Sequence, residues 1–387
     1  LATMQFTFTN AGSITDTDKA GLAKMSARIM NEGTKKLGSS AFAEKLESKA
    51  IHISSSTGVE TFVMEVGSLT ENFDDALGYF AQLLKDPNLT EDALKKIQTT
   101  TVGALSRKEN DFDYTASNEL KSILFKGTPL ANPSSGTIES VKNIELQDIQ
   151  DFIKKNIVTS KLIVVLGGDI DLEAVKEKIA KIIGTLNKGR KTEVKNYTVV
   201  KNAKDSVLNR ETEQAYVYFG SPYNMKVDDE DYYKARVATF ILGTGGFGSR
   251  LMEEIRVKRG LAYSAYARVS VTKSSSYMTG YLQTKLESME EAKATVKEVI
   301  AKFVKKGVTE EELEQTKKFL LGSEPLRVET MNQRLSRTFM EYYKGQELGH
   351  AQKELKKIQK LKLKDLNEFI KSHQEILDIS FAIVTKP

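Results

Sequence analysis

The sequence contains no cysteine and no tryptophan, and only three of its 387 residues are histidine. The lack of cysteine excludes disulfides, zinc sites built on thiolates and cysteine nucleophiles. Long apolar runs are also missing, since no stretch approaches the roughly 18 consecutive apolar residues that a membrane-crossing helix needs. We therefore expect a globular protein without a membrane span.

Charge of one sign does not dominate the chain either. The 57 basic and 52 acidic residues are mixed along the sequence, and the net charge of +5 describes a solvated surface rather than a nucleic-acid footprint. Hydrophobic residues make up 40% and charged residues 28%, which is typical of a folded protein. The chain starts at Leu1 without a Met or an apolar signal core, so we expect an upstream segment to have been removed. A periplasmic or secreted location is then expected, with a cytoplasmic one as the alternative.

An internal repeat predicts the architecture. Residues 146–155 are similar to residues 363–372, and the same separation places Leu69 opposite Leu286 and Val164 opposite Phe381. The length also exceeds what one hydrophobic core usually organises. We predict an α+β fold of two homologous domains, 1–187 and 207–387, joined by a linker over 188–206, each with helices on one face of a mainly antiparallel sheet. Each half starts with alternating apolar residues that indicate a strand: Met4, Phe6 and Phe8, then Tyr216 and Tyr218.

A glycine-rich segment is the first candidate site. Residues 243–248, Gly-Thr-Gly-Gly-Phe-Gly, match the pattern of a dinucleotide-binding turn. The preceding residues have helical rather than strand spacing, however, and no acidic residue follows at about twenty residues to hold a ribose. A flexible turn between two helices is the preferred interpretation. Its glycines remain candidates for a substrate-contacting loop: Gly243, Gly245, Gly246 and Gly248.

The segment after this turn carries a possible pair of hydrogen-bond donors. Ser249 is predicted to cap a helix that Gly260 ends, and residues 261–267 are predicted to form a strand. Arg256 near the helix end and Tyr263 in the strand could then point to one place and stabilise a carbonyl oxygen that gains charge. From spacing alone, an exposed Arg and a packed Tyr remain the alternative.

The first predicted helix, residues 18–32, has an apolar face of Leu22, Met25 and Ile29 and ends at Gly33. Its polar face includes Lys24, Ala27 and Arg28, which offer no metal ligand. The three histidines, His52, His350 and His373, have no partner at a zinc-site spacing, and no serine-hydrolase motif occurs.

Taken together, the repeat, the first helix and the Arg/Tyr segment resemble the peptidase family of pitrilysin, insulysin and mitochondrial processing peptidase. Many members carry G-L-A-H-x-x-E-H-M-x-x-x-G-T on the first helix, and residues 21–34 are similar to it. Lys24 and Arg28 stand where the zinc-binding histidines would be, and Ala27 replaces the glutamate that activates water. The third ligand, a glutamate, is expected within residues 93–108, which contain no Asp or Glu.

By contrast, residues 249–263 are similar to the family motif that carries an Arg/Tyr pair, and Arg256 and Tyr263 match it in identity and spacing. Residues 127–137 also look like the family's turn between two helices. In bacterial members the zinc motif and the Arg/Tyr pair are often divided between two subunits. The resemblance therefore implies a non-catalytic, substrate-binding subunit that holds no cofactor itself and supplies Arg256 and Tyr263 to the zinc site of a homologous partner acting on extended peptides.

The alternative is a purely structural or assembly protein, as the core subunits of respiratory complexes in this family are. A self-sufficient hydrolase is not supported, because no complete catalytic motif is present.

Overall fold

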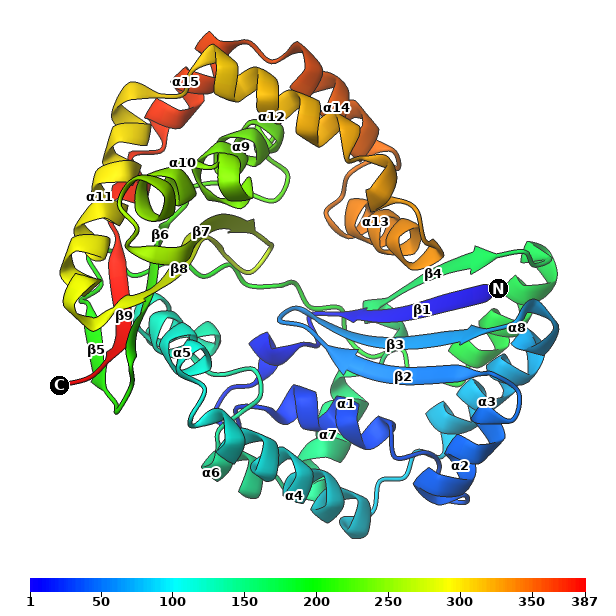
Figure 1. Cartoon of the computed structure of the whole chain (residues 1–387). Helices are drawn as coiled ribbons and strands as arrows, with labels where there is room; N and C mark the ends of the chain where they lie inside the picture. The colour runs from blue at the N-terminus through cyan, green and yellow to red at the C-terminus, as the bar shows by residue number, and fades with distance from the viewer. The chain divides into compact units, whose positions relative to one another are not determined.

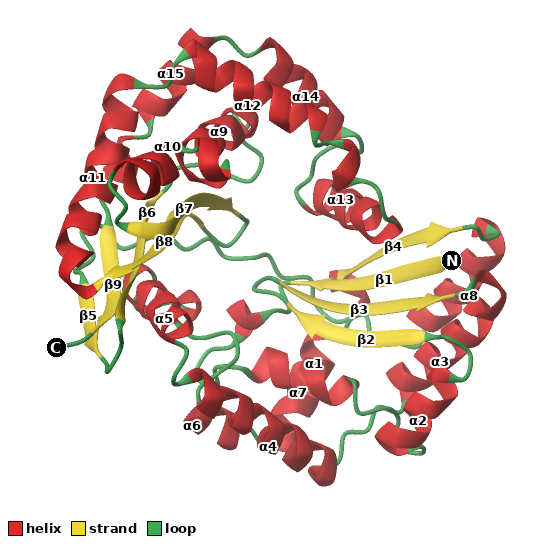
Figure 2. Ribbon diagram, viewed as in Figure 1, coloured by secondary structure: helices red, strands yellow, loops and turns green.

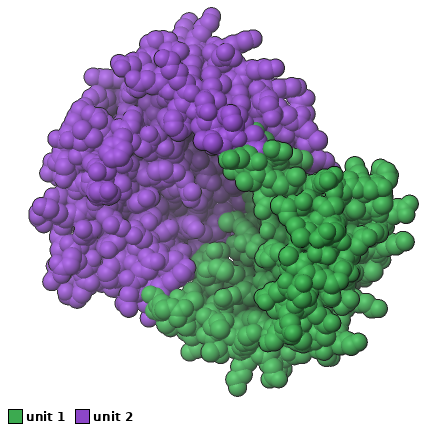
Figure 3. All heavy atoms as spheres, turned by 45° about the vertical axis from the view of Figure 1, so that its right-hand side comes forward, with its two compact units in different colours: residues 1–107, 132–195, 329–339 green, residues 108–131, 196–328, 340–387 purple.

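The computed structural model describes all 387 residues. The chain forms two compact units: unit 1 comprises residues 1–107, 132–195 and 329–339, and unit 2 comprises residues 108–131, 196–328 and 340–387 (Figure 3). Each unit contains one sheet with helices packed on it, which confirms the predicted α+β class (Figure 2). No helix combines the length and the apolar composition that crossing a membrane requires.

Unit 1 is built on an antiparallel sheet in the order β2-β3-β1-β4 (Figure 1). Met4, Phe6 and Phe8 of β1 are fully buried, as their alternation predicts, because helices cover that face of the sheet. The strands are β1 (Ala2–Thr9), β2 (His52–Thr57), β3 (Thr61–Ser68) and β4 (Leu162–Gly168). The helices are α1 (Leu22–Met30), α2 (Gly38–Glu47), α3 (Phe73–Lys85), α4 (Glu91–Lys108), α6 (Ile138–Lys142), α7 (Leu146–Asn156) and α8 (Leu172–Ile183).

Unit 2 is built on a sheet in the order β5-β9-β6-β8-β7, in which only β5 and β9 pair in parallel. The strands are β5 (Ser206–Asn209), β6 (Gln214–Pro222), β7 (Ala262–Val271), β8 (Ser276–Lys285) and β9 (Ser380–Thr385). The helices are α5 (Phe112–Leu124), α9 (Tyr232–Thr239), α10 (Arg250–Met252), α11 (Met289–Lys306), α12 (Glu310–Gly322), α14 (His350–Lys360) and α15 (Leu363–Ser372). Helix α13 (Met331–Tyr343) is divided between the units, with residues 331–339 in unit 1 and residues 340–343 in unit 2.

The main core of unit 2 lies on one face of this sheet. Ala215, Val217 and Phe219 of β6 point into the core, so Tyr216 and Tyr218 point to the opposite face. The alternation of Tyr216 and Tyr218 correctly predicts the strand β6, and the residues between them are the ones that face the core. Small and aliphatic residues fill the core side, and the larger tyrosines stay where their hydroxyl groups can find partners.

The repeat is visible in the order of elements. The matching sequences of residues 146–155 and 363–372 form α7 and α15, and Val164 and Phe381 lie in the equivalent strands β4 and β9. The boundaries 1–187 and 207–387 stay a prediction, because contacts group the chain differently. Helix α5 precedes the predicted linker in sequence but packs on β6 and β9 of unit 2. Residues 187–205 form no helix or strand.

The first helix is shorter than predicted. Helix α1 begins at Leu22 instead of residue 18, because Gly21 adopts a left-handed conformation with φ of 92° that cannot continue a helix backwards. The buried Asp16 carboxylate fixes this start by accepting hydrogen bonds from the N–H groups of Gly21 and Ala23, both at 2.9 Å. Desolvation by burial raises the pKa of Asp16 to about 7, although both hydrogen bonds act to lower it.

Candidate functional site

The segment that carries Arg256 is an irregular helix. After the short α10, residues Glu253–Lys258 wind as a π-helix, whose wider turn changes the direction in which the following side chains point. Ser249 occupies the position before α10, but its predicted capping bond is wrong. Its hydroxyl instead donates to the carbonyl of Gly246 at 2.8 Å, which ties the start of the helix to the glycine turn.

Tyr263 lies at a bulge in β7. Ala262 pairs with Thr284 and Ala265 with Leu282, so two residues, Tyr263 and Ser264, stand opposite the single residue Gln283. An extra residue of this kind re-aims side chains, and bulges are frequent next to binding sites. The Tyr263 side chain is 81% exposed, so the interpretation of Tyr263 as a packed residue is wrong.

The two predicted donors meet in unit 2. The guanidinium carbon of Arg256 lies 4.3 Å from the ring centre of Tyr263 and 4.5 Å from the ring centre of Phe247. Phe247 is 66% exposed, which is unusual for a phenylalanine unless it has a contact to make. The Arg256 side chain has no ion pair or hydrogen bond in the structure, so two aromatic rings hold it while its N–H donors stay available.

The glycine turn explains why Phe247 projects. The turn follows α9 and a second π-helix, Phe240–Thr244, and no strand precedes it, so the dinucleotide-binding geometry is absent. Gly243 is buried, and a Cβ there would lie 2.5 Å from the backbone nitrogen of Ala267 on β7. Gly246 has a φ of 63° and is exposed. Gly245 packs against Phe240, and Gly248 is exposed beside Phe247.

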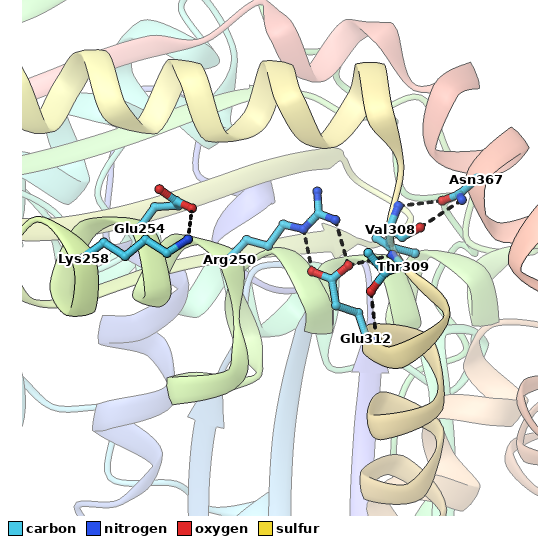
Figure 4. Close-up of polar contacts among 7 residues, drawn as sticks. All are labelled: Arg250, Glu254, Lys258, Val308, Thr309, Glu312 and Asn367. Carbon is cyan, nitrogen blue, oxygen red and sulfur yellow. Dashed lines mark hydrogen bonds and ion pairs between the residues drawn. The ribbon is translucent and has the colours of Figure 1, made fainter.

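One ion pair anchors the start of the Arg256 segment to α12, and a second lies within the segment (Figure 4). Arg250 donates to both carboxylate oxygens of Glu312 on α12, at 2.7 and 2.8 Å, and Lys258 pairs with Glu254 at 2.7 Å. Burial acts to raise the pKa of Glu312, but hydrogen bonds from Arg250 and from the backbone N–H of Thr309 outweigh it and leave the pKa below its ordinary value. A cleft of about 370 Å³ separates this segment from α11 and the start of α12.

In unit 1, Lys24 and Arg28 stand where the family's zinc motif has histidines, and their side chains bind hydroxyl groups instead of a metal. Lys24 donates to the Ser135 hydroxyl at 2.8 Å, within the predicted turn between α5 and α6, and Arg28 donates to the buried Thr101 hydroxyl on α4. Ala27 is buried in the core. Zinc requires neutral nitrogen or anionic donors, and this cluster offers two cations and two hydroxyls, so the residues present do not fit the metal. No other group of metal-ligating side chains is assembled in the chain.

Two residues in these clusters escape prediction from the sequence. Phe247 was treated only as part of the glycine pattern, although a lone aromatic residue among four glycines is itself a signal of exposure. Thr101 lies on α4, within the residues where a third metal ligand was expected, and a neutral threonine there carries no sequence signal of such a position.

Two family models match neighbouring parts of this chain. A family model described as "Insulinase (Peptidase family M16)" matches residues 7–138, and one described as "Peptidase M16 inactive domain" matches residues 143–320. The protein named "Non-peptidase homolog YmxG" of Helicobacter pylori (strain ATCC 700392 / 26695) is 44% identical over 378 residues, which cover 98% of this chain and 87% of that protein. The chain belongs to peptidase family M16. The resemblance drawn from the two motifs is thereby confirmed.

Solved structures of M16 proteins share the whole fold. The crystal structure of a peptidase M16 inactive domain from Pseudomonas fluorescens superposes with a TM-score of 0.91 at 24% identity, covering 100% of this chain and 93% of that one. A protease from Helicobacter pylori gives a TM-score of 0.85 at 17% identity and covers 99% and 94% of the two chains. At these identities the similarity concerns the fold alone.

Proposed function

We propose that this M16 chain is a non-catalytic subunit of a heteromeric zinc peptidase. It binds extended peptides and supplies Arg256 and Tyr263 to a partner subunit that carries the complete H-x-x-E-H zinc motif. The chain itself holds no cofactor in this proposal, and the zinc belongs to the partner.

The observation that carries the proposal is the state of Tyr263. A tyrosine that is 81% exposed contributes little to a core, yet a bulge in β7 and the Arg256 guanidinium fix its direction. Ordering an exposed side chain in this way costs conformational entropy, which a binding role offsets. The Lys24 and Arg28 cluster supports the division of labour, because it gives no place for a metal in this chain.

The chemistry follows from the donors. The phenolic O–H of Tyr263 and the N–H groups of Arg256 can both donate to a peptide carbonyl oxygen, and both bonds strengthen as that oxygen becomes negative during attack by water. Neither residue needs to exchange a proton for this role. Phe247 and the bulge keep the two donors in place before the peptide arrives, so little reorganisation is required at the moment of reaction.

Mixing the chain with a zinc-bearing M16 homologue tests the proposal. Light scattering should show a complex heavier than either chain, and peptide hydrolysis should appear only in the mixture. A candidate that binds but gains no activity would favour the alternative of a structural or assembly protein. A candidate that neither binds nor gains activity would contradict the heteromeric enzyme, with homodimerisation as the competing outcome for the chain alone.

A further inference from the structure

Three tyrosines form a row across the sheet of unit 2. Tyr281 on β8 is the direct cross-strand neighbour of Tyr218 on β6 and of Tyr266 on β7. The ring centres of Tyr218 and Tyr281 are 5.5 Å apart and those of Tyr266 and Tyr281 are 5.9 Å apart. At Tyr218 the row is fixed, because its hydroxyl donates to Asp113 of α5 at 3.1 Å. Tyr281 remains 37% exposed.

This row lies on the same face of the sheet as Tyr263. Core-facing residues of β7 and β8 are Ala265, Ala267 and Leu282, so Tyr266 and Tyr281 point to the opposite face. The bulge that contains Tyr263 stands opposite Gln283, whose side chain donates to Asp113 on that opposite face. Tyr263 and the tyrosine row are therefore successive features of one surface.

Helix α5 covers only part of this face. It packs on β5, β9 and β6, which are the far strands of the sheet from β7. On β8 the helix reaches this face through Asp113, which accepts the hydrogen bond from Gln283, and on β7 an exposed cation, Arg268, lies one row beyond Tyr266.

Arg268 has a second cation as its neighbour. Burial, and then the charge of Arg268, lower the pKa of Lys121 on α5. Neither side chain has an ion pair with a carboxylate in the structure. Both cations therefore lie at this part of the sheet, and an anionic ligand bound there would be attracted by both charges.

We propose that this face is a peptide-binding subsite that recognises an aromatic side chain on the tyrosine row and a carboxylate at Arg268 and Lys121. Successive rows of a sheet face are roughly 7 Å apart, which is also the spacing of residues i and i+2 in an extended peptide. The preferred ligand is thus an extended peptide with an aromatic residue two positions from an acidic one. The inference rests on the proposed function, since it assumes that the chain handles peptides.

Fluorescence anisotropy with the isolated full chain tests the subsite without a partner or turnover. The probe is a fluorescein-labelled, amidated peptide containing Phe-Ser-Glu within Gly and Ser residues, and two further probes replace the Phe by Ser or the Glu by Gln. Tyr266→Ser should weaken binding of the Phe-Ser-Glu probe about two- to tenfold, the range of an aromatic contact, and leave the probe without Phe unaffected. Tyr266→Phe keeps the ring and should bind like the native chain.

Arg268→Gln should weaken binding of the Glu-containing probe by up to about fivefold, and the difference should shrink as salt is raised. Two matched controls are used. Tyr342→Ser changes a tyrosine on α13 that is 64% exposed, and Lys371→Gln changes an exposed lysine in the last turn of α15. Thermal unfolding of each variant checks that the fold is kept.

The subsite is refuted if the native chain does not bind the Phe-Ser-Glu probe, or if Tyr266→Ser and Arg268→Gln bind it as the controls do. That failure is distinct from failure of the proposed function, which is measured as turnover in the mixed complex and depends on Tyr263. If Tyr263→Phe loses turnover in the mixed complex as predicted, but Tyr266→Ser and Arg268→Gln bind the Phe-Ser-Glu probe as the controls do, the subsite is refuted and the proposed function stands.

Discussion

Arg28 on α1 donates a hydrogen bond to the buried hydroxyl of Thr101 on α4. The two helices that would share a zinc ion in a complete M16 site are thus joined here by a cation and a neutral hydroxyl. This hydrogen bond links α1 to α4 without a metal.

Restoring the first-helix motif alone should therefore not create a zinc enzyme. We expect the triple variant Lys24→His, Ala27→Glu and Arg28→His to bind zinc weakly and to hydrolyse little peptide, since a third protein ligand is still missing. Adding Thr101→Glu should raise the zinc content measured by elemental analysis toward one ion per chain. Equal zinc binding by the triple and quadruple variants would contradict the assignment of Thr101 to this position.

Phe247 should act on turnover through Arg256. Phe247→Ala removes one of the two rings against the guanidinium, and an exposed cation–π contact contributes about 0.5–1 kcal/mol. In the reconstituted complex we expect kcat to fall roughly two- to fivefold. Phe247→Tyr should restore turnover, because it keeps the ring. The free energy of unfolding should hardly change, since the side chain is mostly exposed.

The Arg250 and Glu312 pair should matter for stability. Arg250→Ala leaves the half-buried Glu312 carboxylate without its main partner, which should cost about 1–3 kcal/mol in urea unfolding. Lys258→Ala is the matched control, because its pair with Glu254 on the same segment is more exposed and should contribute little to stability.

That stabilisation should disappear in acid. The folded pKa of Glu312 lies below its ordinary value of 4.5, so its contribution is present above about pH 4.5 and is lost as the pH falls through the folded value. The difference between the native chain and Arg250→Ala should consequently shrink when unfolding is measured below this pH. If the difference in unfolding free energy between the native chain and Arg250→Ala stays constant in acid, the Arg250–Glu312 pair is not the source of the stabilisation.

Asp16 should give the opposite pH dependence. Its folded pKa of about 7 lies above the ordinary 3.8, so its contribution to stability is present in full below about pH 4 and is lost as the pH rises to 7. Asp16→Asn cannot ionise. The native chain should be more stable than Asp16→Asn at pH 5 by a margin that narrows or reverses at pH 8, as measured by urea unfolding, and Asp18→Asn on the exposed side of the loop serves as the control.

The sequence predicted the parts of this molecule that depend on local pattern. The strand at Met4, Phe6 and Phe8, the repeat that pairs α7 with α15, and the turn at residues 127–137 all follow from periodicity or similarity. The packing of α5 in unit 2 did not, because an amphipathic helix does not specify which sheet it covers.

In the candidate site, too, local pattern identifies the residues, but tertiary packing decides how they are arranged. Arg256 and Tyr263 were identified by their motif, but their mutual geometry depends on one extra residue in a π-helix and one in a β-bulge. Neither irregularity has a clear sequence signal, since each is decided by the register of the surrounding tertiary contacts. Tyr266 and Tyr281 were missed for a related reason: cross-strand neighbours become visible only when the pairing of β7 with β8 is known.

The turnover of Tyr263→Phe in the reconstituted complex is the most direct test of the account. The substitution removes one hydroxyl group and keeps the ring that contacts Arg256, so folding and subunit affinity should be unchanged. The account predicts that kcat falls on the order of a hundredfold, the usual effect of losing one donor to an oxyanion. Arg256→Lys, which keeps the charge but loses the planar fork, should also impair turnover, and Lys258→Ala should be nearly silent. If Tyr263→Phe complexes cleave peptide at the native rate, Tyr263 is no oxyanion donor and the chain is better described as a scaffold.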